Sequence, residues 1–393
     1  MNEQRIDYID GLRAVAVLTV LAAHIGLHAN ATGRIVHLAE EGSHGVDLFF
    51  ILSGFCLAYP TLLKIRRDAS TLFRITDYAA KRLVRIVPPF YIATFVFLSI
   101  AAVGHWTGHN SIIALPPAFS VLKTLFFLDG RVMLLNDSFW TLMVEFRWYF
   151  VFPVVLAVWL RSPRAFCAIG IASALLYGFT RARGLDFGTL PAFMLGIVAA
   201  DIHIGGGRVP ANVAALVKRL ALPLAVVCAG AGIAQETRAS IPGFSGNDVA
   251  WAYQPTIAGW QFAAFFFVVA AGSLRWLRTI LAWPALVAMG VASYSIYLVH
   301  EPFVRTMFGH VQGPLGIFAA AAGALACGFA FWALVERPFT TGSLRRPLLD
   351  LVRPIVERGF SVLGIAKHMP LGTEEPEQDS NPGYPSGALT ASR

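Results

Sequence analysis

The stretch DGLRAVAVLTVLAAHIGLH, residues 10–28, decides how the rest of the chain is understood. Its apolar run is long enough to cross the hydrocarbon core of a bilayer, which takes about 20 helical residues. Two polar side chains, Arg13 and His24, interrupt that run. A charged or titratable side chain at membrane depth costs free energy unless something compensates, so each of the two marks a functional position by default.

The composition of the whole chain is that of a membrane protein. Of its 393 residues 56% are hydrophobic and 14% are charged, whereas about 25% are charged in an average soluble domain. We therefore predict an all-α fold, a polytopic transmembrane helical bundle of about ten spans, with a re-entrant or interfacial piece at 118–128. The predicted spans are residues 10–28, 45–63, 87–104, 139–160, 165–180, 189–203, 219–235, 256–272, 283–305 and 313–335.

The distribution of positive charge predicts the orientation. Most of the 31 Lys and Arg residues fall in segments that lie inside when the N-terminus is inside, so the positive-inside rule favours both termini in the cytoplasm. We expect a membrane domain over 1–340, a cytoplasmic juxtamembrane segment over 341–360 and a disordered tail over 361–393, which is rich in Pro, Gly and Ser. The four cysteines lack metal-ligand spacing, and we expect no metal site, no nucleic-acid partner and no cleavable signal peptide.

The spacing of Arg13 and His24 predicts one polar face. Eleven residues are almost a whole number of helical turns, so the two side chains project within about 20° of each other and lie about 16 Å apart along the axis. One helix then lines a single cavity, with a cation near its inner end and a titratable base further out. A snorkelling arginine and a structural histidine are the alternative.

Two further arginines lie just before a proline pair at which we expect a helix to be interrupted. Arg82 and Arg85 share a helical face just before Pro88 and Pro89, where a proline pair is expected to interrupt a helix. Arginine binds phosphate through bidentate, charge-assisted hydrogen bonds, so the pair fits an anion site. Ordinary positive-inside flanking charge explains the same pair, and spacing alone does not decide.

Polar residues in the outer half form a second group. Glu145 lies one to two turns into its span among apolar residues, so its carboxylate needs a partner such as an embedded cation or histidine. His300 reaches a similar depth. Asp47 at the start of its span is better explained by helix capping, and Trp140 fits an interfacial or groove-lining role.

Several stretches together resemble the acyltransferase 3 family of membrane acyltransferases. They occur in the family's order and cover about residues 5 to 340. The first contains the family's Arg-x10-His pair, Arg13 and His24, and the third contains its Arg-x-x-Arg pair, Arg82 and Arg85. The stretches are IDGLRAVAVLTVLAAH, GVDLFFILSGF, KRLVRIVPPFY, FWTLMVEFRWYFVFP and SYSIYLVHEPF.

The resemblance implies ten core helices in a bacterial inner (plasma) membrane and an enzyme without a permanently bound cofactor. It implies an acyl-CoA donor, most often acetyl-CoA, supplied from the cytoplasm, and an extracytoplasmic hydroxyl acceptor on a glycan, glycolipid or small molecule. By family position His24 is the catalytic histidine and Arg13, Arg82 and Arg85 hold the donor. Many members have a second acidic residue after Glu145, which this chain lacks. Asp10, Asp47 and Trp140 are expected to support the site.

The mechanism that we expect is general base catalysis. His24 removes the proton from the acceptor hydroxyl as that oxygen attacks the thioester. We expect Glu145 to orient or charge the imidazole, with His300 as the alternative partner. A covalent acyl-histidine route stays open. A secondary transporter or flippase would use the same embedded charges for substrate and protons, although no paired halves stand out in the sequence. A structural subunit whose polar residues join helices is a third interpretation.

Overall fold

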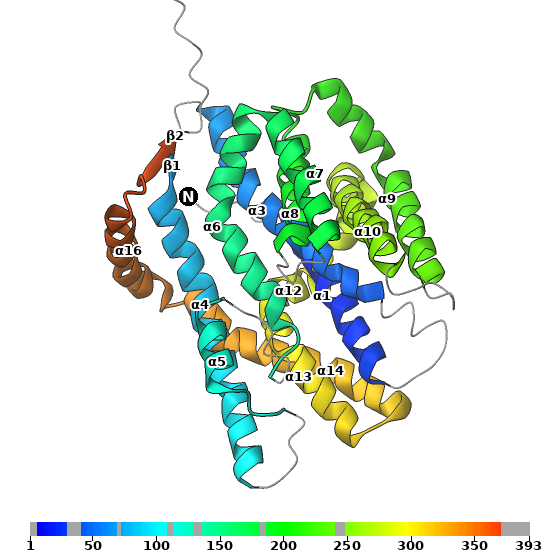
Figure 1. The fold of residues 1–393 in the computed structure, drawn as a ribbon, viewed down its shortest axis with the longest axis vertical. Coiled ribbons are helices and arrows are strands. Elements are labelled where there is room, and N and C mark those ends of the chain that lie inside the picture. The colour runs from blue at the N-terminus through cyan, green and yellow to red at the C-terminus, as the bar shows by residue number, and fades with distance from the viewer. Residues whose placement is uncertain are drawn as a thin grey trace, which may run out of the picture.

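The computed structural model describes residues 6–29, 41–68, 72–107, 113–128, 135–180, 186–239 and 248–370. Regular structure in these residues is almost entirely helical (Figure 1), which confirms the predicted all-α class. The helices are α1 (Asp7–His28), η1 (Glu41–His44), α3 (Gly45–Arg67), α4 (Ile75–Trp106), α5 (Ala118–Leu125), α6 (Phe139–Arg161), α7 (Pro163–Thr180), α8 (Asp186–His203), α9 (Ala211–Ala239), α10 (Asp248–Ser273), α11 (Arg275–Leu281), α12 (Pro284–Val291), α13 (Ser293–His310), α14 (Gly313–Phe331), η2 (Trp332–Glu336), α15 (Arg337–Thr340) and α16 (Arg345–Val362). The strands are β1 (Leu72–Arg74) and β2 (His368–Pro370).

Several of these helices have the length and composition of membrane spans. Within the described ranges six qualify, or seven if the bent pair Ala258–Ser273 and Arg275–Leu281 is one span, and two shorter apolar helices accompany them. A helix or helix pair occupies each predicted span. The protein is thus a multi-pass integral membrane protein, while the count of ten spans and the orientation stay predictions. The predicted re-entrant piece is α5, which at 8 residues is too short to cross a bilayer.

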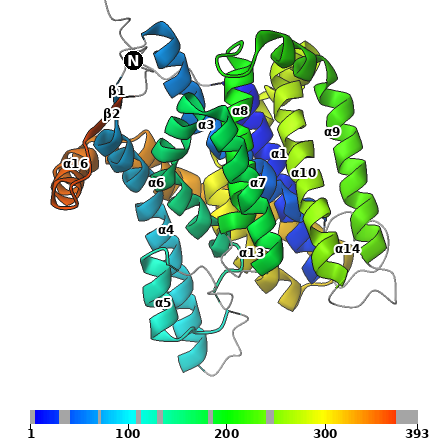
Figure 2. The same ribbon diagram turned by 45° about the horizontal axis from the view of Figure 1, so that its top comes forward.

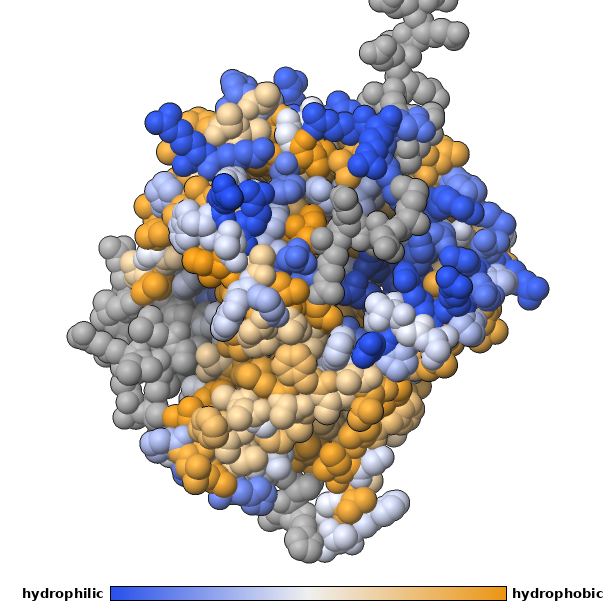
Figure 3. Space-filling model, turned by 180° about the vertical axis from the view of Figure 1, so that it is seen from behind, coloured by the Kyte–Doolittle hydropathy of each residue, from blue (hydrophilic) through white to orange (hydrophobic). Residues whose placement is uncertain are grey.

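Helix α1 runs through the middle of the bundle. In both ribbon views α9 and α10 lie together on one side of it, and α4 and α16 lie on the opposite side (Figures 1 and 2). From behind, an apolar band crosses the lower half of the molecule and hydrophilic residues gather above it (Figure 3). Such an uninterrupted apolar surface suits contact with lipid rather than water.

Glycine allows α3 and α8 to approach closely. A Cβ on Gly54 would lie 2.1 Å from the Phe193 carbonyl oxygen, and one on Gly196 would lie 2.1 Å from that of Ile51. Any larger residue would therefore push the two backbones apart. Small residues at such crossings let membrane helices pack tightly, and this crossing fixes α3 against the rest of the bundle.

Helix α4 continues through Pro88 and Pro89, so the predicted break at these prolines is wrong. Proline lacks an amide N–H and frees the carbonyl four residues earlier. Membrane helices tolerate this where neighbouring groups satisfy the backbone. The carbonyls freed here are those of Val84 and Arg85. Close to them the Tyr294 hydroxyl of α13 donates to the Ile86 carbonyl at 3.0 Å and ties α13 to this part of α4. Arg82 and Arg85 consequently lie inside a continuous 32-residue helix.

The chain stays structured beyond the last apolar helix. Helix α16 reaches Val362 and packs on α4, and β2 pairs antiparallel with β1, matching Phe73 with Met369. The predicted disordered tail was to begin at residue 361, so its first part, up to residue 370, is instead ordered. Backbone pairing and packing on α4 outweigh the polar composition there. Residues 371–393 lie outside the described residues.

Candidate active site

Three cavities follow one another along α1. We name them the arginine cavity, the central cavity and the histidine cavity; their volumes are about 430, 50 and 290 Å³. Arg13 and Arg85 line both the arginine and the central cavity. Val46 and Tyr297 line both the central and the histidine cavity. Shared lining residues place the three cavities next to one another along a polar path through the bundle.

Positive charge gathers in the arginine cavity. Arg13 comes from α1, while Arg82 and Arg85 come from α4, and the structure brings all three together there. None of the three forms a salt bridge with a carboxylate among the described residues. Arg82 instead lies over the rings of Tyr78 and Tyr149, 5.5 and 5.6 Å from their centroids. Cation–π contacts hold an arginine without neutralising it, so the cavity keeps its positive charge for an anionic ligand.

Two acidic side chains also line the arginine cavity. Asp10 lies one helical turn before Arg13 on α1 and is buried. Glu336 is buried too and accepts a 2.5 Å hydrogen bond from the Ser295 hydroxyl. It ends η2, a π-helical turn, and π-helical turns are frequent at functional sites. The sequence suggested for Glu336 no more than an ion pair at the end of a helix.

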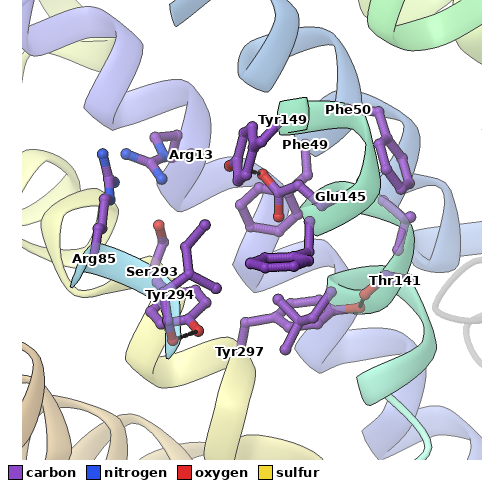
Figure 4. A pocket seen from close by; sticks show the side chains of 14 residues that line it. Arg13, Phe49, Phe50, Arg85, Thr141, Glu145, Tyr149, Ser293, Tyr294 and Tyr297 are labelled. Atoms are coloured by element: carbon purple, nitrogen blue, oxygen red, sulfur yellow. Dashed lines mark hydrogen bonds between the residues drawn. The ribbon is translucent and has the colours of Figure 1, made fainter. Parts of the chain in front are cut away.

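The central cavity is small, and six of its fourteen lining residues are aromatic. Figure 4 shows Arg13 and Arg85 on one side of it and Glu145 with Tyr149 across from them. Glu145 accepts hydrogen bonds from the hydroxyls of Tyr149, at 2.5 Å, and Ser53. At the other end the Tyr297 and Thr141 hydroxyls are 2.6 Å apart.

His24 lies in the histidine cavity. Its neighbour there is His300, and not Glu145. His300 Nε2 is 3.3 Å from His24 Nδ1, and the two rings meet edge to face at 4.9 Å. Glu145 forms its hydrogen bonds with Tyr149 and Ser53 instead. The structure thus does not bring Glu145, the first partner that we expected, beside His24; Glu145 lines the central cavity with Arg13 and Arg85. The alternative, His300, is the one that the structure brings close.

The hydrogen bonds of the two histidines fix their tautomers. His24 Nδ1 is 3.0 Å from the Val20 carbonyl oxygen and His300 Nδ1 is 2.8 Å from that of Tyr297. A carbonyl oxygen only accepts, so each Nδ1 carries a proton. His300 Nε2 then has a lone pair that faces the His24 Nδ1–H. His24 Nε2 is left without a proton, which is the form that a general base requires.

The supporting residues Asp47 and Trp140 also line the histidine cavity. Asp47 Oδ2 accepts from His44 Nδ1 at 3.0 Å and Oδ1 from Gln261 Nε2 at 3.2 Å. The His44 ring in turn stacks on Trp260 at 4.9 Å. The capping interpretation of Asp47 therefore omits its partners from other helices.

Sequence reasoning missed several polar residues of this path. Asp137 lines the histidine cavity, and its Oδ1 is buried without a hydrogen-bond partner among the described residues. Tyr297 and Tyr149 were overlooked because aromatic residues are common in any membrane span. Glu301, completely buried, forms a 3.5 Å ion pair with Arg305 and accepts the Asp137 amide at 3.2 Å. Its adjacency to His300 was the one available signal.

The fold and these cavities define a helical membrane protein with a charged path through its centre. The sequence model of the acyltransferase domain family, Acyl_transf_3, matches residues 6–335. The chain belongs to this family, and it is an acyltransferase. The resemblance stated from the sequence is confirmed, and neither the transporter nor the structural-subunit interpretation is supported.

Three curated relatives are informative. The acyltransferase MdmB of Streptomyces mycarofaciens is 27% identical over 401 residues, covering 89% of this chain and 94% of the relative. The exopolysaccharide production protein ExoZ of Rhizobium meliloti is 27% identical, covering 77% and 93%. The peptidoglycan O-acetyltransferase OatA of Listeria monocytogenes is 26% identical over 44% of this chain, which spans only 28% of that relative. No solved structure matches the chain.

Proposed function

We propose that this protein is a membrane O-acyltransferase that moves an acyl group, acetyl, from acyl-CoA to a hydroxyl of an extracytoplasmic glycan or glycolipid. One observation carries the proposal: a cation-lined cavity and a histidine-lined cavity are joined by a narrow middle section along α1. A transferase of this kind needs separate donor and acceptor sites that meet at one reacting centre.

The arginine cavity supplies the donor site of the proposal. Arg13, Arg82 and Arg85 offer guanidinium groups that no carboxylate of the described chain neutralises by a salt bridge, and CoA carries phosphates that bind such groups bidentately. The positive-inside rule places this end in the cytoplasm of a bacterium, where acyl-CoA is made. The donor would enter there with its thioester leading toward the central cavity.

The central cavity favours a short acyl group. Its volume is about 50 Å³, and about 10–15 Å³ of such space holds one water molecule. An acetyl group fits a space of this size, whereas each further methylene has to displace Phe49, Phe146 or Tyr297 from the lining. Acetyl is therefore the group that we propose.

The histidine cavity supplies the base and the acceptor site. His24 Nε2 takes the acceptor hydroxyl proton as the oxygen attacks the thioester carbonyl carbon. The new C–O bond forms, the C–S bond breaks, and the proton passes from His24 to the leaving CoA thiolate. During the reaction His24 is a cation, and its Nδ1–H bond to His300 Nε2, 3.3 Å in the resting state, then stabilises it.

Names of relatives support the acceptor class. Two of them act in exopolysaccharide production and in peptidoglycan O-acetylation by name. A glycan hydroxyl is the chemistry that these names share. The aromatic and polar lining of the histidine cavity, which includes Trp140, Tyr177 and Gln261, suits sugar faces and hydroxyls.

The experiment that tests the proposal uses the purified protein in nanodiscs with isotopically labelled acetyl-CoA and oligosaccharides from the host's surface glycans. We expect labelled ester on the glycan that is released by mild base, together with free CoA. The His24→Ala variant, inserted and stabilised by CoA to the same degree, should form none. Transfer by that variant at the wild-type rate would exclude the base. A wild-type protein that binds CoA and forms no ester with any glycan would exclude the acceptor class.

A further inference from the structure

We propose that the donor site extends beyond the arginine cavity into a second basic cavity that binds the phosphate-bearing nucleotide end of the donor. We name this cavity the α16 groove. It lies between α4 and the start of α16 and has a volume of about 570 Å³, within the 300–1,000 Å³ of small-molecule sites. The inference rests on the proposed function in one respect, that the donor is a CoA thioester.

The groove adjoins the arginine cavity. Lys81, Thr341, Arg345 and Leu349 line both cavities. A ligand whose thioester has passed Arg13 and Arg85 on the way to His24 therefore has its other end on the side of α4 and α16. CoA is long and flexible, and its charged groups lie at the end away from the sulfur. Its sulfur end can therefore reach toward the reacting centre while its phosphates lie in the basic α16 groove.

Cations dominate the described lining of the groove. Four basic side chains face one carboxylate, that of Asp350. Two of the four, Lys81 and Arg353, already pair with Asp77 at 2.8 and 2.9 Å. The basic residues are Lys81, Arg345, Arg346 and Arg353.

The other two cations have no carboxylate partner. Among the described residues, neither Arg345 nor Arg346 forms a salt bridge. Both are exposed at the mouth of the groove, where a phosphate would meet two adjacent guanidinium groups. Such groups bind phosphate oxygens in pairs, and the diphosphate and ribose phosphate of CoA provide several.

The wall that carries these arginines is held in place. Leu349 and Val356 of α16 pack with Ala79, Ala80 and Val84 of α4 in one buried cluster. The Arg353–Asp77 ion pair holds the segment near the middle of α16, and the β1–β2 pairing holds its C-terminal end. In Figure 1 α16 lies alongside α4 over its length.

This wall is also an addition to the family domain. The family model ends at residue 335, whereas Arg345 begins α16. The segment therefore adds contacts to a donor that Arg13, Arg82 and Arg85 already hold near the reacting centre. Contacts made far from the thioester and kept through the reaction change KM and leave kcat unchanged.

Phosphate could also reach the groove as a lipid headgroup. Leu351 and Ile355 of α16 are 62% and 61% exposed, as in a helix that lies at a membrane surface. The position of the groove beside the arginine cavity favours the donor, because a headgroup site needs no such neighbour. Experiments with and without anionic lipid distinguish the two sources.

The test compares the Arg345→Gln/Arg346→Gln double variant with wild type and with Arg358→Gln. Arg358 lies on the same helix, is exposed and does not line the groove. Each protein is given acetyl-CoA, acetyl-dephospho-CoA and acetylpantetheine in neutral-lipid nanodiscs. We expect the double variant to raise KM for acetyl-CoA about tenfold or more and to change kcat less than about twofold. Its KM for acetylpantetheine should equal that of wild type. The Arg358→Gln control should have the wild-type KM for every donor.

Three outcomes would overturn the inference. The first is an unchanged KM for acetyl-CoA, and the second is an equal rise for acetylpantetheine, which lacks the nucleotide. The third is a KM effect confined to nanodiscs with anionic lipid, which identifies a headgroup site. Thermal stabilisation by CoA and by pantetheine, measured on the same proteins, tests the groove without turnover. A groove that binds CoA in a protein that acylates nothing would disprove the proposed function and leave this inference standing.

Discussion

The arginine and histidine cavities share helix α1 and differ in their chemistry. The first is lined by Arg13, Arg82 and Arg85, none of which forms a salt bridge to a described carboxylate. The second has no Lys or Arg among its described lining residues and holds His24, His44, Asp47 and Asp137 instead. One end of the path can attract a polyanion, and the other can move a proton without a strong cation nearby to oppose charge on the imidazole.

The two ends are also held differently. Arg82 is oriented by ring faces, which tolerate rotation of the side chain. His24 and His300 are each held by a backbone carbonyl at 3.0 Å or less, so both their positions and their tautomers are set. Donor binding allows such tolerance, whereas proton transfer does not, because a base has to lie within hydrogen-bond reach of its proton.

The largest effect is expected from a variant that changes the histidine cavity and leaves the arginine cavity intact. His24→Ala removes the general base, and we expect transfer to fall by about 10²- to 10⁴-fold. Stabilisation by acetyl-CoA should persist, because the arginine cavity is untouched. The rate of labelled ester formation measures the loss of transfer, and the thermal shift with acetyl-CoA measures whether donor binding persists. Loss of CoA binding together with activity would show that the two ends are not separable.

The next effect concerns the partner of the base. His300→Ala should lower kcat by about ten- to a hundredfold, because a hydrogen bond to the charged form of His24 is lost. KM for acetyl-CoA should stay unchanged. His300→Gln should restore part of kcat, since an amide oxygen can accept from His24 Nδ1–H. An equal loss in both variants would indicate that His300 only fills space.

How far the sequence could predict these ends depends on the range of the interactions. Placement of Arg13 and His24 on one face follows from helical periodicity, which is local, and the structure agrees. The choice between Glu145 and His300 depends on how α6 and α13 rotate against α1. Long-range packing decides that, so the sequence left it open and preferred Glu145, whereas the structure brings His300 beside His24. Arg82 and Arg85 were recognised, but the continuity of α4 was not, since a proline pair usually ends a helix and only the surrounding bundle allows this one to continue.

The α16 segment shows a second limit of prediction from sequence. Its arginines looked like charge that flanks a last span, and nothing local distinguishes flanking charge from a binding wall. The difference arises from β1–β2 pairing and from α4, which bring residues far apart in the chain together. Contacts of that range are absent from local patterns.

A smaller effect sharpens the arginine end. Arg85→Gln keeps the side-chain size and removes the charge that lines both the arginine and the central cavity. We expect KM for acetyl-CoA to rise about tenfold, with a smaller change in kcat. Arg161→Gln is the matched control, because Arg161 is exposed at the end of α6 and lines none of these cavities. A fall in kcat alone would move Arg85 from donor binding to the chemical step.

The smallest effect probes the junction between the two ends. Val46 lines both the central and the histidine cavity, so the size of its side chain limits the acyl group that can be presented to His24. Val46→Ala should raise the rate with butyryl-CoA relative to acetyl-CoA by about three- to tenfold, and Val46→Ile should lower it, since one methylene in an apolar pocket discriminates by about 1–3 kcal/mol. Competition between the two donors in one reaction measures the ratio directly. If both variants left the ratio unchanged, the acyl group would not pass through the central cavity, and the two ends would have to meet elsewhere along α1.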